Sequence, residues 1–318
     1  MIRNIAVLGA GTMGHGIAEA FAIYGYPVNL YETSEKIRSS VKETIKSELI
    51  FAAENGLVDK AEIESILNKI TLYDNLKSAV ENVDYVIEAT PEIIELKQKL
   101  FVEIDSYCKK DTIIASNTSS LALNEMMKNV SDFRKEKMMV CHWYNPAHLM
   151  PIAELSFFGN MSEDDYNTVE RLYQSIGKQT VKVLKDVPGL VANRIQQGVA
   201  REVFSLIEMG VASPKDIDTA LKFGPAFRYV TTGQLEVADM GGLDIWCTVG
   251  DNLLSVMDNI KEANPILRQK VTEGKLGLKS GEGFFVYPEE KLEEMKNDFN
   301  KRLIMQLKVS KNYIDKEK

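Results

Sequence analysis

Short apolar runs alternate with amphipathic stretches through the first 186 residues. The runs that we expect to form strands cover residues 5–8, 28–31, 85–88, 113–115, 138–141, 152–156 and 180–184. Most of the stretches between them repeat their apolar residues at helical spacing. Such alternation is typical of a mostly parallel, doubly wound sheet with helices on both faces. Residues 34–70 predict a helical hairpin that bends at Asn55-Gly56.

The pattern becomes purely helical after the break at Asp186-Val187-Pro188-Gly189. Ile195 and Val199 begin an apolar stripe at helical spacing, and Ser213 followed by Pro214 is typical of a helix start. We therefore expect two domains, an α/β domain over residues 1–186 and an all-α domain over residues 187–318.

Residues 292–307 also carry an apolar stripe, within a helix rich in Lys and Glu. This helix either packs on its own domain or contacts another subunit.

A glycine-rich turn follows the first expected strand. It reads Gly9-Ala10-Gly11-Thr12-Met13-Gly14, a helix is predicted over residues 13–24, and the second strand ends in Glu32. Such a turn brings backbone N–H groups to a pyrophosphate, and an acid at this distance accepts hydrogen bonds from a ribose. The carboxylate of Glu32 would repel a 2′-phosphate. The turn therefore predicts a Rossmann-type site for NAD, with a ligand-free tight turn as the alternative.

His142 is one of only three histidines, and it follows the apolar run 138–141. Ligands of open α/β sheets bind at the carboxyl ends of strands. Glu154 lies in the next apolar stretch. A histidine that accepts a proton and a carboxylate that orients it form a general-base pair. The alternative is a half-buried structural histidine beside an unrelated acid.

Composition excludes several classes of protein. The chain has 318 residues, 45% of them hydrophobic and 26% charged, with a net charge of −8. This charge argues against nucleic-acid binding, and the absence of a long apolar run argues against a membrane span. Three cysteines at unrelated spacings predict neither disulfides nor a metal site. The chain enters a strand directly from its first residues, so no signal peptide is expected and the predicted compartment is the cytoplasm.

The sequence resembles the L-3-hydroxyacyl-CoA dehydrogenases over nearly its whole length. The matching segments are GAGTMG with Glu32, EATPEIIELKQKLF, ASNTSSL, HWYNP with Glu154, VANR, SPKDIDTALKFG and GLKSGEGFF. The resemblance implies NAD-dependent oxidation of a 3-hydroxyl group, with His142 as general base, Glu154 as its acid partner, and Ser119 and Asn193 holding the substrate oxygen. Cofactor contacts are implied for Glu92, Lys97, Asn117, Ser119, Asn145 and Lys279, and a homodimer built through the helical domain is implied as well.

The same residues allow plainer interpretations. Asn117 and Ser119 follow an expected strand and could serve as a helix cap, as could Asn193. Lys97 belongs to a charged helix face that would be solvated, and Lys279 lies in a loop. His15 and His148 are expected to be bystanders.

The segment KSELIFAAENGL departs from the acyl-CoA pattern. Counting from Glu32, Glu48 and Asn55 stand where acyl-CoA members place a serine and lysines near the CoA, and Glu54 adds a further acid. Acids there would repel phosphate. Pro151 replaces a lysine of the mitochondrial members.

Arg228 lies in FRYVTTGQLE, which resembles a segment of the gulonate and carnitine dehydrogenases. An arginine suits a free carboxylate, although a surface or interface arginine is the alternative. The first functional hypothesis is therefore a short-chain, 3-hydroxybutyryl-type L-3-hydroxyacyl-CoA dehydrogenase. The second is a dehydrogenase of a free 3-hydroxy acid that uses Arg228, and the third is a crystallin-like NADH-binding protein.

Overall fold

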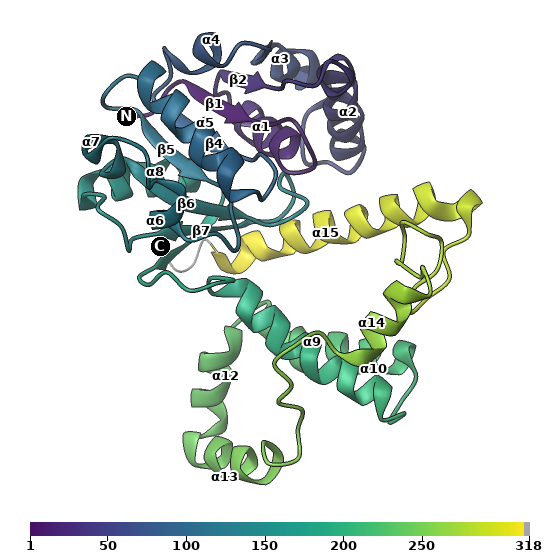
Figure 1. Cartoon of the computed structure of the whole chain (residues 1–318). Coiled ribbons are helices and arrows are strands. Elements are labelled where there is room, and N and C mark those ends of the chain that lie inside the picture. The colour runs from purple at the N-terminus through teal and green to yellow at the C-terminus, as the bar shows by residue number, and fades with distance from the viewer. Residues whose placement is uncertain (315–318) are drawn as a thin grey trace. The chain divides into compact units, whose positions relative to one another are not determined.

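The computed structural model describes residues 1–314 and divides into two compact units (Figure 1). The first unit is Met1–Val191, and the second begins at Ala192. The boundary predicted after residue 186 falls five residues before this division.

The first unit is built on an eight-stranded sheet in the order β3-β2-β1-β4-β5-β6-β7-β8. Every neighbouring pair is parallel except β6 and β7, which are antiparallel. The predicted doubly wound α/β class is therefore confirmed. The strands are β1 (Ile5–Leu8), β2 (Val28–Tyr31), β3 (Ile70–Tyr73), β4 (Tyr85–Glu88), β5 (Ile113–Ser116), β6 (Met138–Trp143), β7 (Ile152–Ser156) and β8 (Gln179–Val183).

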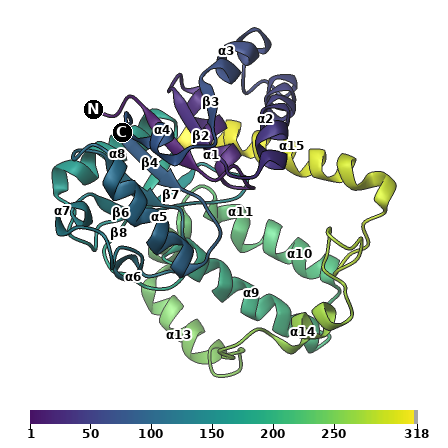
Figure 2. The ribbon, with the colours of Figure 1, turned by 45° about the horizontal axis from the view of Figure 1, so that its top comes forward.

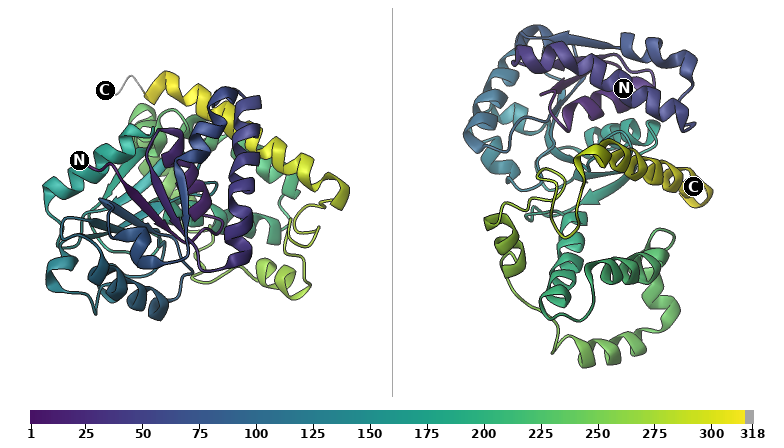
Figure 3. Two further views of the ribbon diagram at one scale, coloured as in Figure 1. Left: turned by 90° about the horizontal axis from the view of Figure 1, so that it is seen from above. Right: turned by 90° about the vertical axis from the view of Figure 1, so that its right-hand side faces the viewer.

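Helices cover both faces of this sheet because its central strands are apolar on both faces (Figure 3, left). In β1, Ile5 and Val7 pack into one core, and Ala6 and Leu8 pack into the other. The first core is completed by α1 (Gly14–Ile23), α2 (Glu35–Glu54), α3 (Ile63–Asn68) and α8 (Glu163–Ser175). The second core is completed by α4 (Leu76–Val80), α5 (Ile94–Tyr107) and α6 (Leu123–Met126). The short helices η1 (Lys60–Glu62) and α7 (Asp132–Lys135) lie in connections.

Two strands differ most from the prediction, while β5 and β8 differ by one residue at their ends. The sequence analysis missed β3, a four-residue edge strand that is only partly buried and therefore shows little apolar patterning. The prediction also ended β6 at Cys141, whereas the strand continues to Trp143. His142 is therefore held within the strand, and its position is fixed by the sheet.

The second unit is helical, as predicted (Figure 2). It contains α9 (Ala192–Glu208), α10 (Pro214–Phe223), α11 (Pro225–Tyr229), α12 (Gly233–Gly241), α13 (Leu243–Leu253), α14 (Pro265–Thr272), η2 (Glu289–Lys291) and α15 (Leu292–Ile314). Helix α9 packs against α10 and α14. Ser213 caps α10 by accepting the N–H of Asp216, at the start predicted from Ser213-Pro214. Within residues 1–314, no helix combines the length and the apolar character that crossing a bilayer requires.

Candidate active site

The glycine-rich turn has the backbone that a dinucleotide requires. Gly9 has φ of +95°, and a Cβ at Gly14 would lie 1.7 Å from the carbonyl oxygen of Gly9. These two positions therefore need glycine. At Gly11 no described atom lies within 4 Å of the Cβ position, so the backbone is open to a ligand. Helix α1 begins directly after Met13 without a side-chain cap, which leaves N–H groups of its first turn for an anion.

Glu32 is fixed at the end of β2 by two backbone amides. Its carboxylate accepts the N–H of Ala10 at 2.9 Å and the N–H of Ser34 at 2.8 Å. The acid is thereby tied to the glycine turn as well as to the start of α2. The turn and the acid together fit the pyrophosphate and ribose of NAD.

Glu32→Gln is expected to weaken the discrimination between NADH and NADPH by about tenfold, which corresponds to roughly 1.4 kcal/mol. The amide removes the negative charge that opposes a 2′-phosphate and keeps one acceptor oxygen. Titration of both cofactors by fluorescence measures the ratio of their dissociation constants. Glu35→Gln, which changes an exposed acid three residues away, is the matched control and should keep the ratio. An unchanged ratio in Glu32→Gln would contradict this role for Glu32.

His142 and Glu154 face each other across the antiparallel pair β6 and β7. They occupy paired positions in the register, and His142 Nδ1 lies 2.8 Å from Glu154 Oε2. Glu154 is fully buried and His142 is 7% exposed. The second carboxylate oxygen of Glu154 accepts the N–H of Val191 at 2.9 Å. A carboxylate accepts from Nδ1–H, so this arrangement leaves the lone pair of Nε2 available to take a proton.

Tyr144 lies edge-on against the His142 ring, with 4.9 Å between ring centroids. Burial and the negative charge of Glu154 raise the pKa of Tyr144 to about 12. The phenol therefore stays protonated at neutral pH and does not compete with His142 as a base.

Asn117 and Ser119 lie in the loop that follows β5. Asn117 accepts the N–H of Trp143 through its side-chain oxygen at 2.8 Å, which ties the loop to β6 next to His142. Ser119 donates its backbone N–H to Glu92 at 3.3 Å, and its carbonyl accepts the N–H of Gly189 at 3.1 Å. The structure thus places these two predicted residues in the loop beside the strand that carries His142.

Glu92 also accepts hydrogen bonds from the hydroxyl groups of Thr118 and Ser120. Burial alone would raise the pKa of Glu92, but these hydroxyls and the charge of Lys97 together hold it below its usual value. Glu92 is therefore an anion that organises the backbone around Ser119.

Lys97 is not solvated, contrary to what the charged pattern of its helix suggested. It is 1% exposed, and its Nζ lies 2.7 and 2.8 Å from the two oxygens of Glu88, which is fully buried. Glu88 is the last residue of β4, much as Glu32 directly follows β2, and the sequence analysis did not select it. Its sequence position could have drawn attention to it, because Glu88 is an acid at the end of an apolar strand. Lys97 also lies 3.4 Å from Glu92, so it joins β4 to the loop around Ser119.

The remaining predicted residues lie elsewhere. Asn145 is exposed in the connection that follows β6. Asn193 lies in the first turn of α9, Arg228 is exposed in α11, and Lys279 is exposed in the turn after α14, all within the second unit. Their participation in the site stays a prediction.

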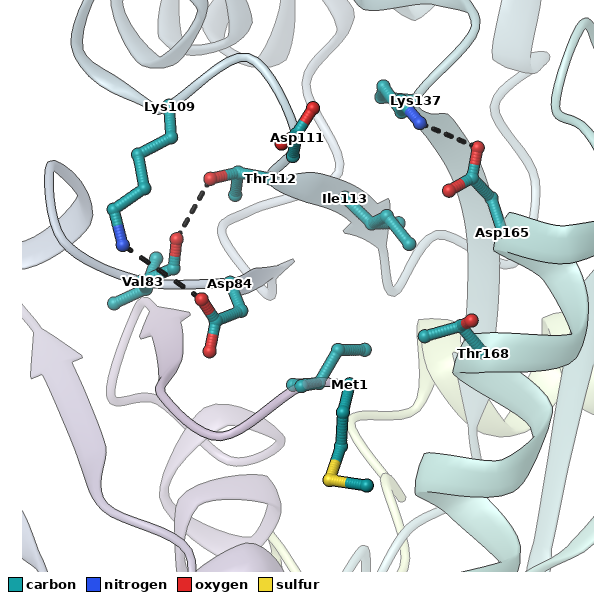
Figure 4. A pocket seen from close by; sticks show the side chains of 11 residues that line it. Met1, Val83, Asp84, Lys109, Asp111, Thr112, Ile113, Lys137, Asp165 and Thr168 are labelled. Atoms are coloured by element: carbon teal, nitrogen blue, oxygen red, sulfur yellow. Dashed lines mark hydrogen bonds and ion pairs between the residues drawn. The ribbon is translucent and has the colours of Figure 1, made fainter.

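Two hollows of the first unit can be compared with the position expected for a ligand. One, of about 280 Å³, lies at the amino ends of β1 and β5 and includes Asp84, Lys109 and Asp165 in its lining (Figure 4). This is the edge opposite to the one at which parallel sheets bind ligands. A small hollow of about 10 Å³ lies beside Ser119, between residues 118–121 and 186–190. It lies at the carboxyl end of β5 and has room for at most one water molecule.

The fold and the glycine turn define a dinucleotide-binding oxidoreductase whose sheet also carries a histidine–carboxylate pair. Two family models match the chain, the 3-hydroxyacyl-CoA dehydrogenase NAD binding domain over residues 4–187 and the 3-hydroxyacyl-CoA dehydrogenase C-terminal domain over residues 189–287. The chain belongs to the NAD-dependent 3-hydroxyacyl-CoA dehydrogenase family.

Its relatives act on different substrates. The chain is 34% identical to 5-formyl-3-hydroxy-2-methylpyridine 4-carboxylate 5-dehydrogenase of Mesorhizobium japonicum, over 96% of this chain and 97% of that protein. It is 35% identical to a probable 3-hydroxybutyryl-CoA dehydrogenase of Bacillus subtilis, over 91% and 98%. A crystal structure of the pyridine carboxylate dehydrogenase, described as an NAD⁺-dependent dismutase, superposes with a TM-score of 0.89 at 31% identity, covering 98% of this chain and 99% of that one.

Proposed function

We propose that the chain is an NAD-dependent dehydrogenase that oxidises a carbinol with His142 as general base. The observation that carries this proposal is the buried contact of 2.8 Å between His142 and Glu154. An alcohol loses its hydroxyl proton as hydride leaves its carbon, so a base within reach of the hydroxyl lowers the barrier. Bound NAD supplies the hydride acceptor.

In the oxidation, Nε2 of His142 takes the hydroxyl proton and the ring becomes an imidazolium. Glu154 is positioned to stabilise that charge, and its contact with Nδ1 keeps Nε2 directed away from Glu154. Ser119 and Asn193 would hold the substrate oxygen by hydrogen bonds. In the reverse direction, the carbonyl carbon gains a hydride and the imidazolium returns its proton to the carbonyl oxygen, which becomes the hydroxyl group.

For the substrate, we propose a compact free carboxylate, a broader class that includes the free 3-hydroxy acids of the second hypothesis of the sequence analysis. The alignment with the pyridine carboxylate dehydrogenase covers 96% of the chain, so it must include part of the 23-residue helix α15, which lies beyond the C-terminal family model. This extended likeness favours a substrate of the same class. An exposed arginine, Arg228, is available in α11 to pair with a carboxylate.

The 3-hydroxybutyryl-CoA hypothesis, which was the first hypothesis of the sequence analysis, is kept as the second candidate, because the relative in Bacillus subtilis is named a probable 3-hydroxybutyryl-CoA dehydrogenase at 35% identity. One of the arguments against it needs correction. Glu48 does not stand free to repel phosphate, since its Oε1 is 3.2 Å from His15 Nε2.

A substrate panel separates the two candidates. The panel contains L-3-hydroxybutyryl-CoA with acetoacetyl-CoA, free 3-hydroxy acids, and hydroxymethyl and formyl derivatives of aromatic carboxylates, with absorbance of NADH as the readout. We expect turnover with free carboxylates and a kcat/KM at least tenfold lower with the thioesters. The opposite order would establish the acyl-CoA candidate.

Arg228→Lys is expected to lower kcat/KM for the free carboxylate by about tenfold to hundredfold, because an ammonium cannot replace the two-pronged guanidinium contact. The control is Lys222→Gln, which removes an exposed cation of α10 and should leave kcat/KM unchanged. Equal values for Arg228→Lys and the unmodified chain would remove Arg228 from substrate binding.

We also propose a homodimer. Exposed large apolar residues on the helices of the second unit support this proposal, among them Phe227, Leu235, Met240, Ile245, Leu253 and Leu254.

A further inference from the structure

Two histidines that the sequence analysis treated as bystanders belong to one cluster in the first unit. His15 and Glu19 lie one turn apart on α1, Glu48 lies on α2, and His148 lies in the connection between β6 and β7. One ligand atom each from Glu19, Glu48 and His148 lies within 4.8 Å of the other two. His15 Nε2 is 3.2 Å from Glu48 Oε1, and His148 Nδ1 is 3.8 Å from Glu19 Oε2. Four side chains capable of binding a metal therefore converge from three segments of the chain.

Glu19 gives the strongest sign that a ligand belongs in this cluster. Its side chain is fully buried, and as a carboxylate it has no hydrogen-bond donor in the described part of the chain, although a protonated Glu19 can hydrogen-bond to Glu48. Glu48 Oε2 is also buried without a partner among these residues. Buried polar atoms are nearly always satisfied, and an unsatisfied carboxylate in an apolar core is costly. The two carboxyl groups therefore require a proton or a cation between them.

The orientation of His15 allows it to serve as a metal ligand. Its Nδ1 lies 2.7 Å from the carbonyl oxygen of Gly11, which can only accept, so Nδ1 carries the proton. Nε2 faces Glu48 Oε1 at 3.2 Å, so it donates to that carboxylate when it carries a second proton and can bind a cation once that proton is lost. Histidines that bind metals typically donate their other ring N–H to a backbone carbonyl in this way.

We propose that Glu19, Glu48 and His148, with His15 as a fourth ligand, form a binding site for a divalent transition-metal ion such as Zn²⁺. Two carboxylates and one divalent cation give a neutral cluster, which suits a buried position. Imidazole ligands favour Zn²⁺ and its neighbours over Ca²⁺ and Mg²⁺. Ligand atoms around tetrahedral zinc lie roughly 3.3–3.6 Å apart, so the most distant atoms of the cluster must draw together on binding.

The metal would join α1 and α2 to the connection that follows the catalytic strand β6. It would also fix His15, whose hydrogen bond to Gly11 supports the dinucleotide turn. The expected role is structural, because neither His142 nor Glu154 belongs to this cluster. The inference is independent of the proposed substrate.

Metal binding to the full chain tests this site. The protein is first treated with a chelator. Zn²⁺ is then titrated in by isothermal calorimetry, and Tm is measured by thermal unfolding with and without Zn²⁺. Binding of one Zn²⁺ per chain and a rise in Tm are expected, and Co²⁺ in place of zinc should show the visible absorption of a four-coordinate site. Glu19→Gln, which is nearly isosteric and uncharged, should raise the Kd for Zn²⁺ by at least about a hundredfold and keep the fold of the apo protein.

Glu43→Gln, an exposed acid on the same helix as Glu48, is the matched control and should bind zinc like the unmodified chain. His148→Gln is the second variant and should also lose the high-affinity site. Absence of zinc binding to the unmodified chain would overturn the proposal. So would unchanged affinity in both Glu19→Gln and His148→Gln, since the ion would then bind elsewhere and a proton would occupy the carboxyl pair.

Discussion

Replacing His142 with glutamine is expected to lower kcat by about 10²–10⁴-fold, the usual contribution of a general base. Glutamine keeps much of the shape and polarity of the side chain and has no group that can take a proton near neutral pH. The dissociation constant of NADH should stay nearly unchanged, because the contacts expected for the dinucleotide come from the glycine turn and Glu32. Steady-state kinetics with the best substrate of the panel and fluorescence titration of NADH measure the two quantities.

Glu154→Gln provides the accompanying comparison. Its single amide oxygen can accept from only one of His142 Nδ1–H and Val191 N–H, and the amide cannot stabilise an imidazolium by charge. We therefore expect a smaller loss of kcat than in His142→Gln. Near-normal turnover in the His142 variant would remove this residue from the chemistry, and a parallel loss of NADH binding would indicate a structural role.

The parts of the site that could be predicted are those encoded by neighbouring residues. The glycine turn needs positive φ at Gly9 and no side chain at Gly14. Both positions belong to the six consecutive residues 9–14, so the sequence motif alone identifies the turn. Glu32 and Glu154 could be selected because each lies in or at the end of an apolar run. The family resemblance then supplied roles that spacing alone left open, such as that of Ser119.

The parts that could not be predicted depend on contacts between distant segments. Lys97 has the sequence surroundings of a solvated lysine, and only the packing of α5 beside β4 brings it to Glu88. His15, Glu48 and His148 come from three separate segments, so no spacing rule joins them. Strand β3 pairs in parallel with β2, a contact between distant segments that the local sequence of β3 does not indicate.

Replacing Lys97 with methionine is expected to lower the free energy of unfolding of the first unit by about 3–5 kcal/mol, the usual cost of leaving a buried charge without its partner. Glu88 would keep its hydrogen bonds from Thr90 and Ser116, but no cation would balance it. Urea unfolding measures the change. The chain has two tryptophans, and Trp143 is buried in the first unit, so a Trp246→Phe background lets fluorescence report that unit alone.

Lys99→Met is the matched control for this experiment, because Lys99 is an exposed lysine two residues along the same helix. Its expected effect lies within about 0.5 kcal/mol of zero. The double variant Lys97→Met/Glu88→Gln removes both charges and should recover most of the lost stability, since an uncharged pair carries no desolvated ion. Equal stability of Lys97→Met and Lys99→Met would show that the charge of Lys97 is not needed to hold Glu88 in the core. A double variant no more stable than Lys97→Met would instead assign the loss to packing around the lysine stem.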